Sequence, residues 1–346
     1  MLRAARGYLK CRPATDCDTT SRRADTPAEN ASNLDAHPNR SSLSAGPATT
    51  PARYNGSVPI QLIAMDLDGT LLHTEGHMPA ANARAIREAA AHGVEIVIVT
   101  GRRFTSARTI AGEIGCDVHL ICSNGALIKS CDGTTHFRHL LPAPTARAVL
   151  ETTAEFRGSA GVIFDRPRER QIYFERVDWE GPFVGPYLRR HRDQVAEVSP
   201  LTQCLDGEDP VEILYLDTCS RVRRASKLLE LLAAEHKFTL ALTEYPHRDL
   251  SMLDVLAAGV NKGAALAEWA RLRGVPRENV MAIGDNWNDR EMLEYAGLPV
   301  VMGNGIPELK SLGWSVTGTN DDCGLAEAIH RHVLRDVSRQ SKGGMS

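Results

Sequence analysis

The 346-residue sequence lacks any apolar run close to the ~18 to 20 residues needed to cross a bilayer. Its formal net charge is only −3, which gives no reason to expect binding to nucleic acid or to an anionic membrane. Its eight cysteines include no Cys-x-x-Cys pair, which argues against zinc. The cysteines indicate reduced thiols in a cytoplasmic chain, with a disulfide framework as the alternative. Nothing in the sequence indicates an oligomeric state.

The first part of the chain also lacks sustained hydrophobic periodicity. Residues 1–56 are rich in Ala, Thr, Ser, Asn, Asp and Pro, so they cannot bury enough apolar area to offset the entropy of ordering. We therefore predict a disordered tail over residues 1–56 and a second short one over residues 339–346. The whole chain is 42% hydrophobic and 24% charged, ordinary values for a globular protein, and it is long enough for two domains.

From residue 61 onward, short apolar segments alternate with helical patterns. Strand, helix and strand in succession with tight links favour right-handed crossovers and a parallel sheet. The sequence therefore predicts an α/β fold with a doubly wound, Rossmann-like parallel core built from residues 57–128 and 257–338. The expected core strands are residues 62–65, 94–99, 118–122, 280–284, 299–302 and 315–317, and the expected helices are 80–92, 104–114, 261–274, 289–296 and 324–334.

The pattern changes between residues 129 and 256, where strand-like stretches follow one another with fewer helices. This arrangement favours an inserted α+β domain with a mixed or antiparallel sheet. The alternative, one continuous larger sheet, is disfavoured because acids at strand ends vanish here and resume only at Asp285. The expected strands are residues 161–164, 171–174, 211–216, 238–242 and 251–256, and the expected helices are 145–156 and 221–236.

Two acids follow the first predicted core strand, at the edge where open α/β sheets hold their ligands. Asp66 comes directly after the strand and suits a nucleophile or metal ligand. Asp68 stands beside Gly69, which frees the backbone, and suits a mobile general acid and base. The alternative is a turn in which Asp and Gly only cap and bend the chain.

Three further motifs follow in order. Thr100-Gly101-Arg102 ends the second strand, Lys262 begins a helical pattern, and Asp285 and Asp289 follow a later strand within Gly-Asp-Asn-x-Asn-Asp. Together with Ser123-Asn124-Gly125, this ordered set resembles the haloacid dehalogenase superfamily of aspartate-nucleophile phosphotransferases, and in particular its Cof-like branch. The resemblance covers about residues 58 to 338, and it implies that the insert is a cap domain.

The resemblance implies a phosphatase that forms an aspartyl-phosphate. Asp66 would attack the phosphoryl group, and Asp68 would protonate the leaving alkoxide and then deprotonate the hydrolytic water. Because the substrate is a dianion, cations must absorb charge. Lys262 would be the fixed cation, and Mg²⁺ would be held by Asp66, Asp285 and the Asp68 backbone carbonyl, with Asp289 as a further or indirect ligand.

The resemblance also implies a shell of phosphate and substrate contacts around the catalytic Thr100. Each of these residues has a simpler alternative. Lys262 could be a solvated lysine, Asn288 and Asp289 could be helix caps, and Asn124-Gly125 could be only a turn. The implied contacts are Leu67, Gly101, Arg102, Ser123, Asn124, Gly125 and Asn288.

Small phosphorylated metabolites, especially sugar phosphates, are the substrates that the resemblance implies. Two alternatives stay open: a phosphohexomutase of the same superfamily, and a non-catalytic phosphosugar-binding regulator. A dehalogenase is disfavoured because halide leaves without a proton, so Asp68 would have no task. A pure binder is disfavoured because it has no use for the nucleophile Asp66.

Overall fold

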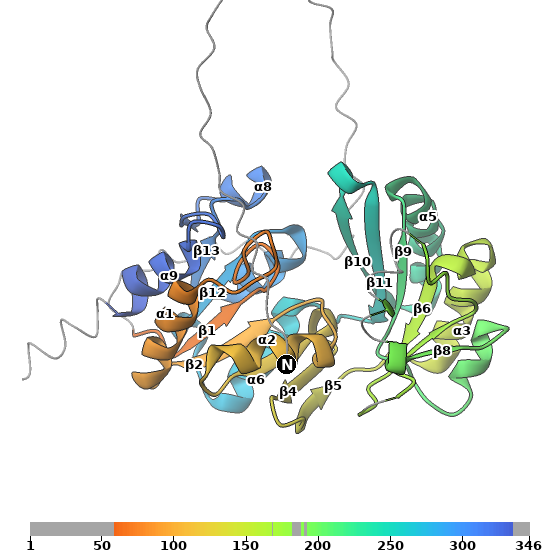
Figure 1. Ribbon diagram of the computed structural model, residues 1–346, viewed down its shortest axis with the longest axis horizontal. Helices are drawn as coiled ribbons and strands as arrows, with labels where there is room; N and C mark the ends of the chain where they lie inside the picture. The colour runs from red at the N-terminus through yellow and green to blue at the C-terminus, as the bar shows by residue number, and fades with distance from the viewer. Residues whose placement is uncertain (1–58, 168, 182–187, 190–191, 335–346) are drawn as a thin grey trace, which may run out of the picture. The chain divides into compact units, whose positions relative to one another are not determined.

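The computed structural model describes residues 59–167, 169–181, 188–189 and 192–334 of the chain. These residues build two β-sheets with helices packed against them (Figure 1). The tails predicted for residues 1–56 and 339–346 lie outside the described residues.

The larger sheet has eight strands in the order β14-β13-β12-β1-β2-β3-β4-β5. All neighbours from β14 to β3 run parallel, whereas β4 and β5 are antiparallel additions at one edge. The central strands are continuous apolar runs because both of their faces are buried. The strands are β1 (Leu62–Met65), β2 (Glu95–Val99), β3 (His119–Cys122), β4 (Leu127–Ser130), β5 (Thr135–Arg138), β12 (Val280–Gly284), β13 (Leu298–Val301) and β14 (Ser315–Val316).

Helices cover both faces of the larger sheet, as the side chains of β1 show. Ile63 and Met65 belong to one buried cluster with α1, α2 and α9, whereas Leu62 and Ala64 belong to another with α6, α7 and α8. All four side chains are fully buried, and the predicted doubly wound fold is confirmed. The helices are α1 (Ala80–Ala91), α2 (Phe104–Ile114), α6 (Lys262–Arg273), α7 (Arg290–Tyr295), α8 (Pro307–Lys310) and α9 (Gly324–Ile329), which a π-helical turn, η8 (His330–Leu334), follows.

The strand order reverses at β1, which creates the crevice that matters for function. The chain passes from β1 to β2 on one side of the strand, and β12, which comes much later, pairs with the other side. The loops that leave β1 and β12 therefore meet at the same edge of the sheet. Open α/β sheets bind their ligands at such a switch point.

The smaller sheet, called the inserted sheet below, has six strands in the order β10-β11-β9-β6-β7-β8. Its neighbours are antiparallel except for β7 and β8, as a mixed α+β insert requires. Helices α3 and α5 pack against it through a core of their own. The elements are α3 (Ala143–Thr152), β6 (Ala160–Ile163), β7 (Ile172–Phe174), β8 (Val195–Glu197), β9 (Glu212–Asp217), α5 (Cys219–His236), β10 (Phe238–Tyr245) and β11 (Leu250–Ala257).

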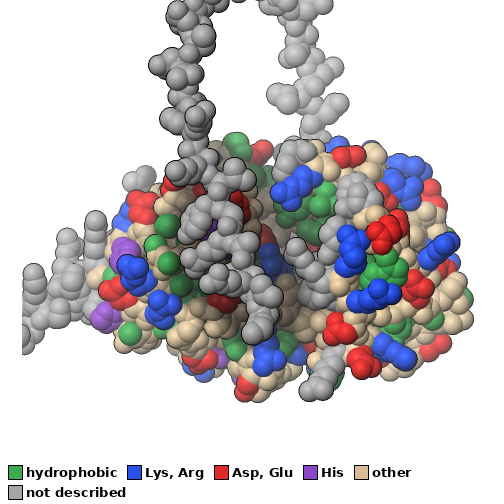
Figure 2. Space-filling view, in the orientation of Figure 1, with side chains coloured by type: hydrophobic (Ala, Val, Ile, Leu, Met, Phe, Trp, Pro, Cys, Tyr) green, Lys and Arg blue, Asp and Glu red, His purple; other side chains and the backbone are tan. Residues whose placement is uncertain are grey.

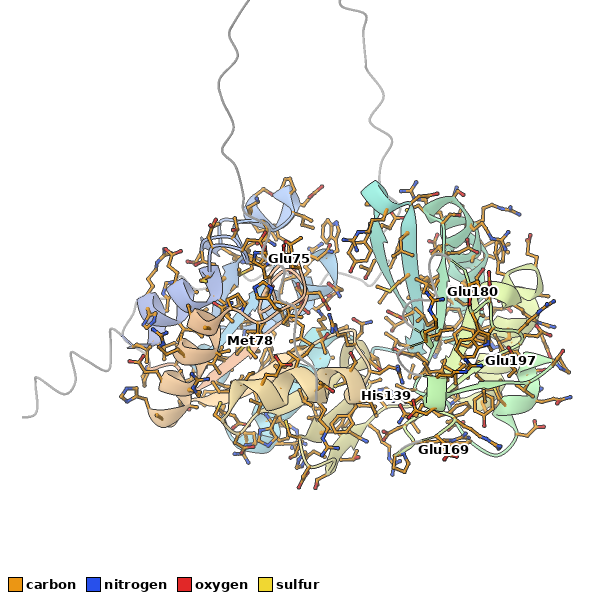
Figure 3. The ribbon with its side chains drawn as sticks, viewed as in Figure 1. Glu75, Met78, His139, Glu169, Glu180 and Glu197 are labelled. Atoms are coloured by element: carbon orange, nitrogen blue, oxygen red, sulfur yellow. The ribbon has the colours of Figure 1, made fainter. Side chains whose placement is uncertain are left out.

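The insertion begins later than predicted. Residue 129 lies inside β4, and the β4–β5 hairpin keeps the chain on the larger sheet as far as Arg138. His139, labelled in Figure 3, follows directly, and the chain then leads to α3. β5 is an edge strand with most of its side chains exposed, so it lacks the buried apolar run that marks a core strand. At the other end, β11 finishes at Ala257, one residue beyond the predicted boundary.

The surface agrees with the small net charge. Figure 2 shows Lys and Arg side chains interspersed with Asp and Glu over the face that it draws. Among the described residues, no helix is both long enough and apolar enough to cross a membrane. The cysteines of the described residues are free thiols, namely Cys116, Cys122, Cys131, Cys204, Cys219 and Cys323.

Candidate active site

Two neighbouring strands deliver the central acids. Asp66 follows β1 and Asp285 follows β12, and the two strands pair in register, with Met65 opposite Ile283. The Asp66 backbone N–H donates to the Ile283 carbonyl at 3.0 Å, which continues the ladder to the end of the strand. Carboxylate oxygens of Asp66, Asp285 and Asp289 lie within 4.8 Å of one another. The predicted grouping of these acids is therefore present in the fold.

Lys262 is the cation of this cluster. It begins α6, whose N-cap is Asn261, and its side chain is 1% exposed. Its Nζ donates to Asp66 Oδ1 at 2.7 Å and to Asp289 Oδ1 at 2.6 Å. Burial alone would lower the pKa of Lys262, but Asp289 and Asp66 outweigh it and raise the pKa, so the amine is charged.

The carboxylates are crowded beyond what Lys262 can neutralise. Burial, followed by repulsion from Asp289 and Asp285, raises the pKa of Asp66 well above its usual value despite Lys262. Burial and Asp289 likewise raise the pKa of Asp285 to about 7, although Thr70 Oγ1 donates to this carboxylate at 3.0 Å. Three acids beside one lysine leave excess negative charge in a buried place. Carboxylate oxygens in this number suit a hard divalent cation.

Asp289 differs from the other two acids because both of its oxygens are engaged. Oδ1 receives Lys262, and Oδ2 accepts the backbone N–H groups of Asp285 at 2.9 Å and of Asn286 at 3.1 Å. The N-cap of the turn η7 (Trp287–Asp289) is Asn286, which forms a capping box with Asp289. Asp289 therefore fixes the Asp285 loop and the lysine, and its role as a direct metal ligand stays a prediction.

Asp68 is held by an arginine. Arg102 donates Nε to Asp68 Oδ2 at 2.7 Å and NH2 to Oδ1 at 2.5 Å, a bidentate pair at the partly exposed mouth of the site. Between Asp66 and Asp68, Leu67 is fully buried and its carbonyl accepts the Leu72 N–H at 2.9 Å. The predicted acid and base thus reaches solvent, whereas the predicted nucleophile is buried.

Glycine 69 keeps this turn against Asp285. Its φ of +85° lies in the left-handed region, and a Cβ at this position would come within 2.4 Å of Asp285 Oδ2. Thr70, one residue on, makes the hydrogen bond to Asp285 described above. Thr70 belongs to the first motif, but no sequence pattern indicates a role for it.

The second motif forms a tight loop, residues 100–102, called the phosphate loop below. Thr100 is 1% exposed, and its Oγ1 accepts the Arg102 N–H at 3.1 Å. The Asn124 amide fills the space beside Gly101, where a Cβ would lie 3.1 Å from Asn124 Oδ1. Arg102, the last residue of this loop, makes the ion pair with Asp68 described above. The contact of the loop with phosphate stays a prediction.

The other predicted substrate contacts are Ser123, Asn124, Gly125 and Asn288. Ser123 and Asn124 are buried, and their side chains hydrogen-bond carboxylates of the inserted sheet, namely Glu212 and Asp254. Asn288 lies in η7 and is half-buried. Their assignment as substrate contacts stays a prediction, as does that of Gly125.

Sequence reasoning missed Tyr245, at the end of β10 in the inserted sheet. β10 packs against η7, and burial followed by the charges of Asp68, Asp66 and Asp285 raises the pKa of Tyr245 to about 12. The inserted sheet thus brings a phenol within electrostatic reach of the acids. A lone tyrosine at a strand end carries no sequence signal for such a position.

The chain belongs to the haloacid dehalogenase-like hydrolases, because the model of that family matches residues 63–329. The Cof-like membership predicted from the four motifs is confirmed. Hydrolases of this family generally use a divalent metal ion, and the cluster of Asp66, Asp285 and Asp289 offers a place for one.

Individual relatives are phosphatases. Phosphatase YwpJ of Bacillus subtilis is 27% identical over 301 residues, which cover 80% of this chain and all of that protein. The 5-amino-6-(5-phospho-D-ribitylamino)uracil phosphatase YcsE of the same organism is 30% identical over 277 residues, covering 80% and 97%. The solved structure of BT1666, a phosphatase from Bacteroides thetaiotaomicron, is similar with a TM-score of 0.65 at 26% identity, covering 80% and 97%. The prediction of a phosphatase is therefore confirmed.

Proposed function

We propose that this chain is a Mg²⁺-dependent phosphomonoester hydrolase that acts on small phosphorylated metabolites, sugar phosphates among them, through an aspartyl-phosphate on Asp66. The observation that carries the proposal is the contact of Lys262 Nζ with Asp66 Oδ1 at 2.7 Å. A buried carboxylate held by a buried ammonium group beside the phosphate loop suits attack on a phosphoryl group. The name of the YcsE relative, which specifies a small phosphorylated compound, supports the substrate class.

The reaction is a double displacement. An Asp66 carboxylate oxygen bonds to phosphorus while the ester P–O bond breaks, and the leaving alkoxide takes the proton of Asp68. A water molecule then bonds to phosphorus and gives its proton to Asp68 as the acyl phosphate bond to Asp66 breaks. Inorganic phosphate leaves, and both aspartates return to their starting states.

Charge control is shared between the fixed cation and Mg²⁺. Asp66, Asp285 and the Asp68 backbone carbonyl would hold the metal ion, which would supply positive charge at the phosphoryl oxygens when bound. Lys262 lies against Asp66, so it reduces the repulsion between the nucleophile and the dianion. Asp289 keeps Lys262 in place through its 2.6 Å contact.

The Arg102 contact bears on the two tasks of Asp68. A carboxylate paired bidentately with a guanidinium group is the base that the second step needs. To serve as the acid of the first step, Asp68 must carry a proton, which requires Arg102 to release it. An anionic phosphoryl group beside residues 100–102 offers Arg102 another partner, so substrate binding would free Asp68.

The test is Asp66→Asn, since the amide keeps the shape of the side chain but is a poor nucleophile. Hydrolysis of a panel of phosphorylated metabolites with Mg²⁺ should fall below about a tenth of the wild-type rate. The control is Asp206→Asn, because Asp206 is an exposed residue of the insert and does not belong to the acid cluster. This variant should keep full activity. A rapid acid quench followed by mass spectrometry should find phosphate on Asp66 only. Phosphate on another residue would refute the mechanism.

A further inference from the structure

The turn η1 (Ser123–Gly125) has an unusual backbone. Three successive residues have positive φ, with 49° at Ser123, 52° at Asn124 and 108° at Gly125. Residues other than glycine adopt this region at a cost, and they do so where surrounding contacts over-determine the conformation. The contacts that hold the turn therefore indicate what it is for.

The backbone of the turn binds the phosphate loop. The Ser123 N–H donates to the Arg102 carbonyl at 3.0 Å, and the Asn124 N–H donates to the Thr100 carbonyl at 3.1 Å. The Asn124 amide also fills the space that a side chain at Gly101 would need. The shape of the loop thus depends on where the turn, and Asn124 above all, is held.

The side chains of the same two residues bind the inserted sheet. Asn124 Nδ2 donates to Asp254 Oδ2 on β11 at 2.8 Å, and Ser123 Oγ donates to Glu212 Oε1 on β9 at 3.1 Å. Asp254 is 9% exposed and Glu212 is 2% exposed. Ser123 and Asn124 therefore each join the phosphate loop through the backbone N–H and the inserted sheet through the side chain.

Burying two carboxylates on neighbouring strands is unfavourable. Burial raises the pKa of Asp254 to about 7, and burial together with Asp254 raises that of Glu212 well above its ordinary value. A hydrophobic pair at these positions would avoid this cost. The hydrogen bonds that Ser123 and Asn124 donate to the two acids offset part of this cost.

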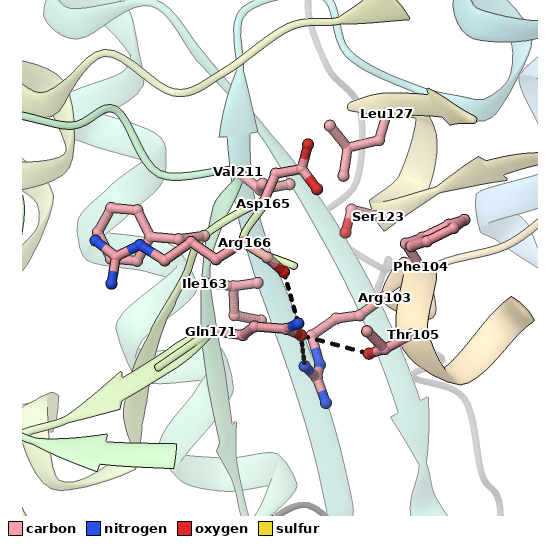
Figure 4. Close-up of a pocket in the computed structure, with 11 residues that line it drawn as sticks. Arg103, Phe104, Thr105, Ser123, Leu127, Ile163, Asp165, Arg166, Gln171 and Val211 are labelled. Carbon is pink, nitrogen blue, oxygen red and sulfur yellow. Dashed lines mark hydrogen bonds between the residues drawn. The ribbon is translucent and has the colours of Figure 1, made fainter. Parts of the chain in front are cut away.

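The junction between the larger sheet and the insert has little free space beside Ser123. The cavity drawn in Figure 4, which Ser123 and Val211 help to line, holds only about 20 Å³, room for at most a water molecule. Two of its lining residues, Arg103 and Gln171, are joined by a hydrogen bond from Arg103 NH1 to Gln171 Oε1 at 2.9 Å. A third, Asp165, accepts from Lys129 Nζ at 2.5 Å. The junction is thus closed by contacts between the larger sheet and the insert, and it is too small for a second ligand.

We propose that Asp254 is a positioning residue for the phosphate loop, acting through the Asn124 side chain, with Glu212 acting in parallel through Ser123. The inference rests on the proposed function, because it assumes that residues 100–102 bind the phosphoryl group. The turn also packs against the start of α6, since a Cβ at Gly125 would lie 2.4 Å from the carbonyl oxygen of Asn261, the residue before Lys262. The insert therefore sets the geometry of the phosphate site through the turn.

The experiment measures binding of inorganic phosphate by calorimetry in the full chain with Mg²⁺. Asp254→Ala should weaken phosphate binding about tenfold, because Asn124 loses the acceptor that orients it. Asp254→Asn should bind within about twofold of wild type, because its amide oxygen can still accept from Asn124. Ser251→Ala is the control: Ser251 is buried on the same strand, and its Oγ donates to Thr243 O at 3.3 Å, away from the turn.

A second variant makes the path testable. Asn124→Gly removes the amide without strain at φ 52°, and it should weaken phosphate binding by a similar factor. In that background Asp254→Ala should have little further effect, since residues that act through one contact are not additive. If Asp254→Ala does not fold, Asn124→Gly alone decides, and unchanged phosphate affinity in it overturns the proposal.

Two further outcomes would overturn the proposal. One is equal phosphate affinity in Asp254→Ala and Ser251→Ala, and the other is an Asp254→Asn variant as weak as Asp254→Ala. Failure of the wild type to bind phosphate would also overturn it. Hydrolysis of p-nitrophenyl phosphate, measured in parallel, tests the proposed function separately, because a wild type that binds phosphate without turnover would refute only that function.

Discussion

Replacing Lys262 with methionine tests the charge balance on which the site depends. Lys262 is 1% exposed and contacts two buried acids, Asp66 at 2.7 Å and Asp289 at 2.6 Å. Methionine fills a similar volume, so the packing changes little and the loss reports the missing charge. Removing one partner of a buried ion pair costs about 3–5 kcal/mol, because an uncompensated charge is left behind. We therefore expect Lys262→Met to lower the free energy of unfolding by about that amount.

The assay is urea unfolding in the presence of chelator, since any bound cation would stabilise the variant. Lys227→Met, on the exposed face of α5, is the control and should change stability by less than about 0.5 kcal/mol. Adding Asp66→Asn to Lys262→Met should recover part of the loss, because it removes one of the unpaired carboxylates. A loss below about 1 kcal/mol, or no recovery in the double variant, would refute the view that Lys262 neutralises the cluster.

Three further predictions follow from single contacts. Asp285→Ala should raise the Mg²⁺ concentration for half-maximal activity far more than Asn288→Ala does, and equal shifts would contradict the assignment of Asp285. Gly69→Ala should lose at least about 1 kcal/mol more stability than Gly76→Ala. The two glycines have nearly the same φ (+85° and +84°), but of the two only Gly69 has a neighbour that a Cβ would meet. Equal melting temperatures of the two variants would contradict this prediction. Because the pKa of Asp254 rises from 3.8 to about 7, the folded chain keeps a proton that the unfolded chain loses, and stability falls as pH rises through that window. Asp254→Asn should remove up to about 1.4 kcal/mol per pH unit of this slope in urea unfolding, and parallel curves would speak against it.

The sequence predicted the centre of the fold better than its edges. The first core strand, residues 62–65, coincides with β1, because a strand buried on both faces must be apolar throughout. β5 was missed, since an edge strand with exposed side chains needs no such run. The helix predicted over residues 145–156 is observed as α3 (Ala143–Thr152). Its C-cap, Thr153, hydrogen-bonds Val149 O within the helix and Tyr215 Oη on β9, and the second of these contacts has no local sequence signal.

The acids of the site were predictable for the same reason that the core was. A carboxylate directly after a buried strand lies at the ligand edge of the sheet, and neighbouring strands bring Asp66 and Asp285 together. The partners of these acids were less predictable. Lys262 was expected beside Asp66, but its second contact with Asp289 depends on how α6 and α7 pack. No local pattern records the packing of two helices.

The link between Asn124 and Asp254 lies furthest from what a single sequence can predict. The two residues are 130 positions apart, and each looks ordinary in its own segment, a turn residue before glycine and an acid in a strand. Only the fold shows that the acid is buried and that the Asn124 side chain bonded to it belongs to the turn that supports the phosphate loop. In the proposed function, specificity would come from the insert and chemistry from the larger sheet. If the turn couples the two, substitutions in the insert that move β11 would alter phosphate binding as well as substrate choice.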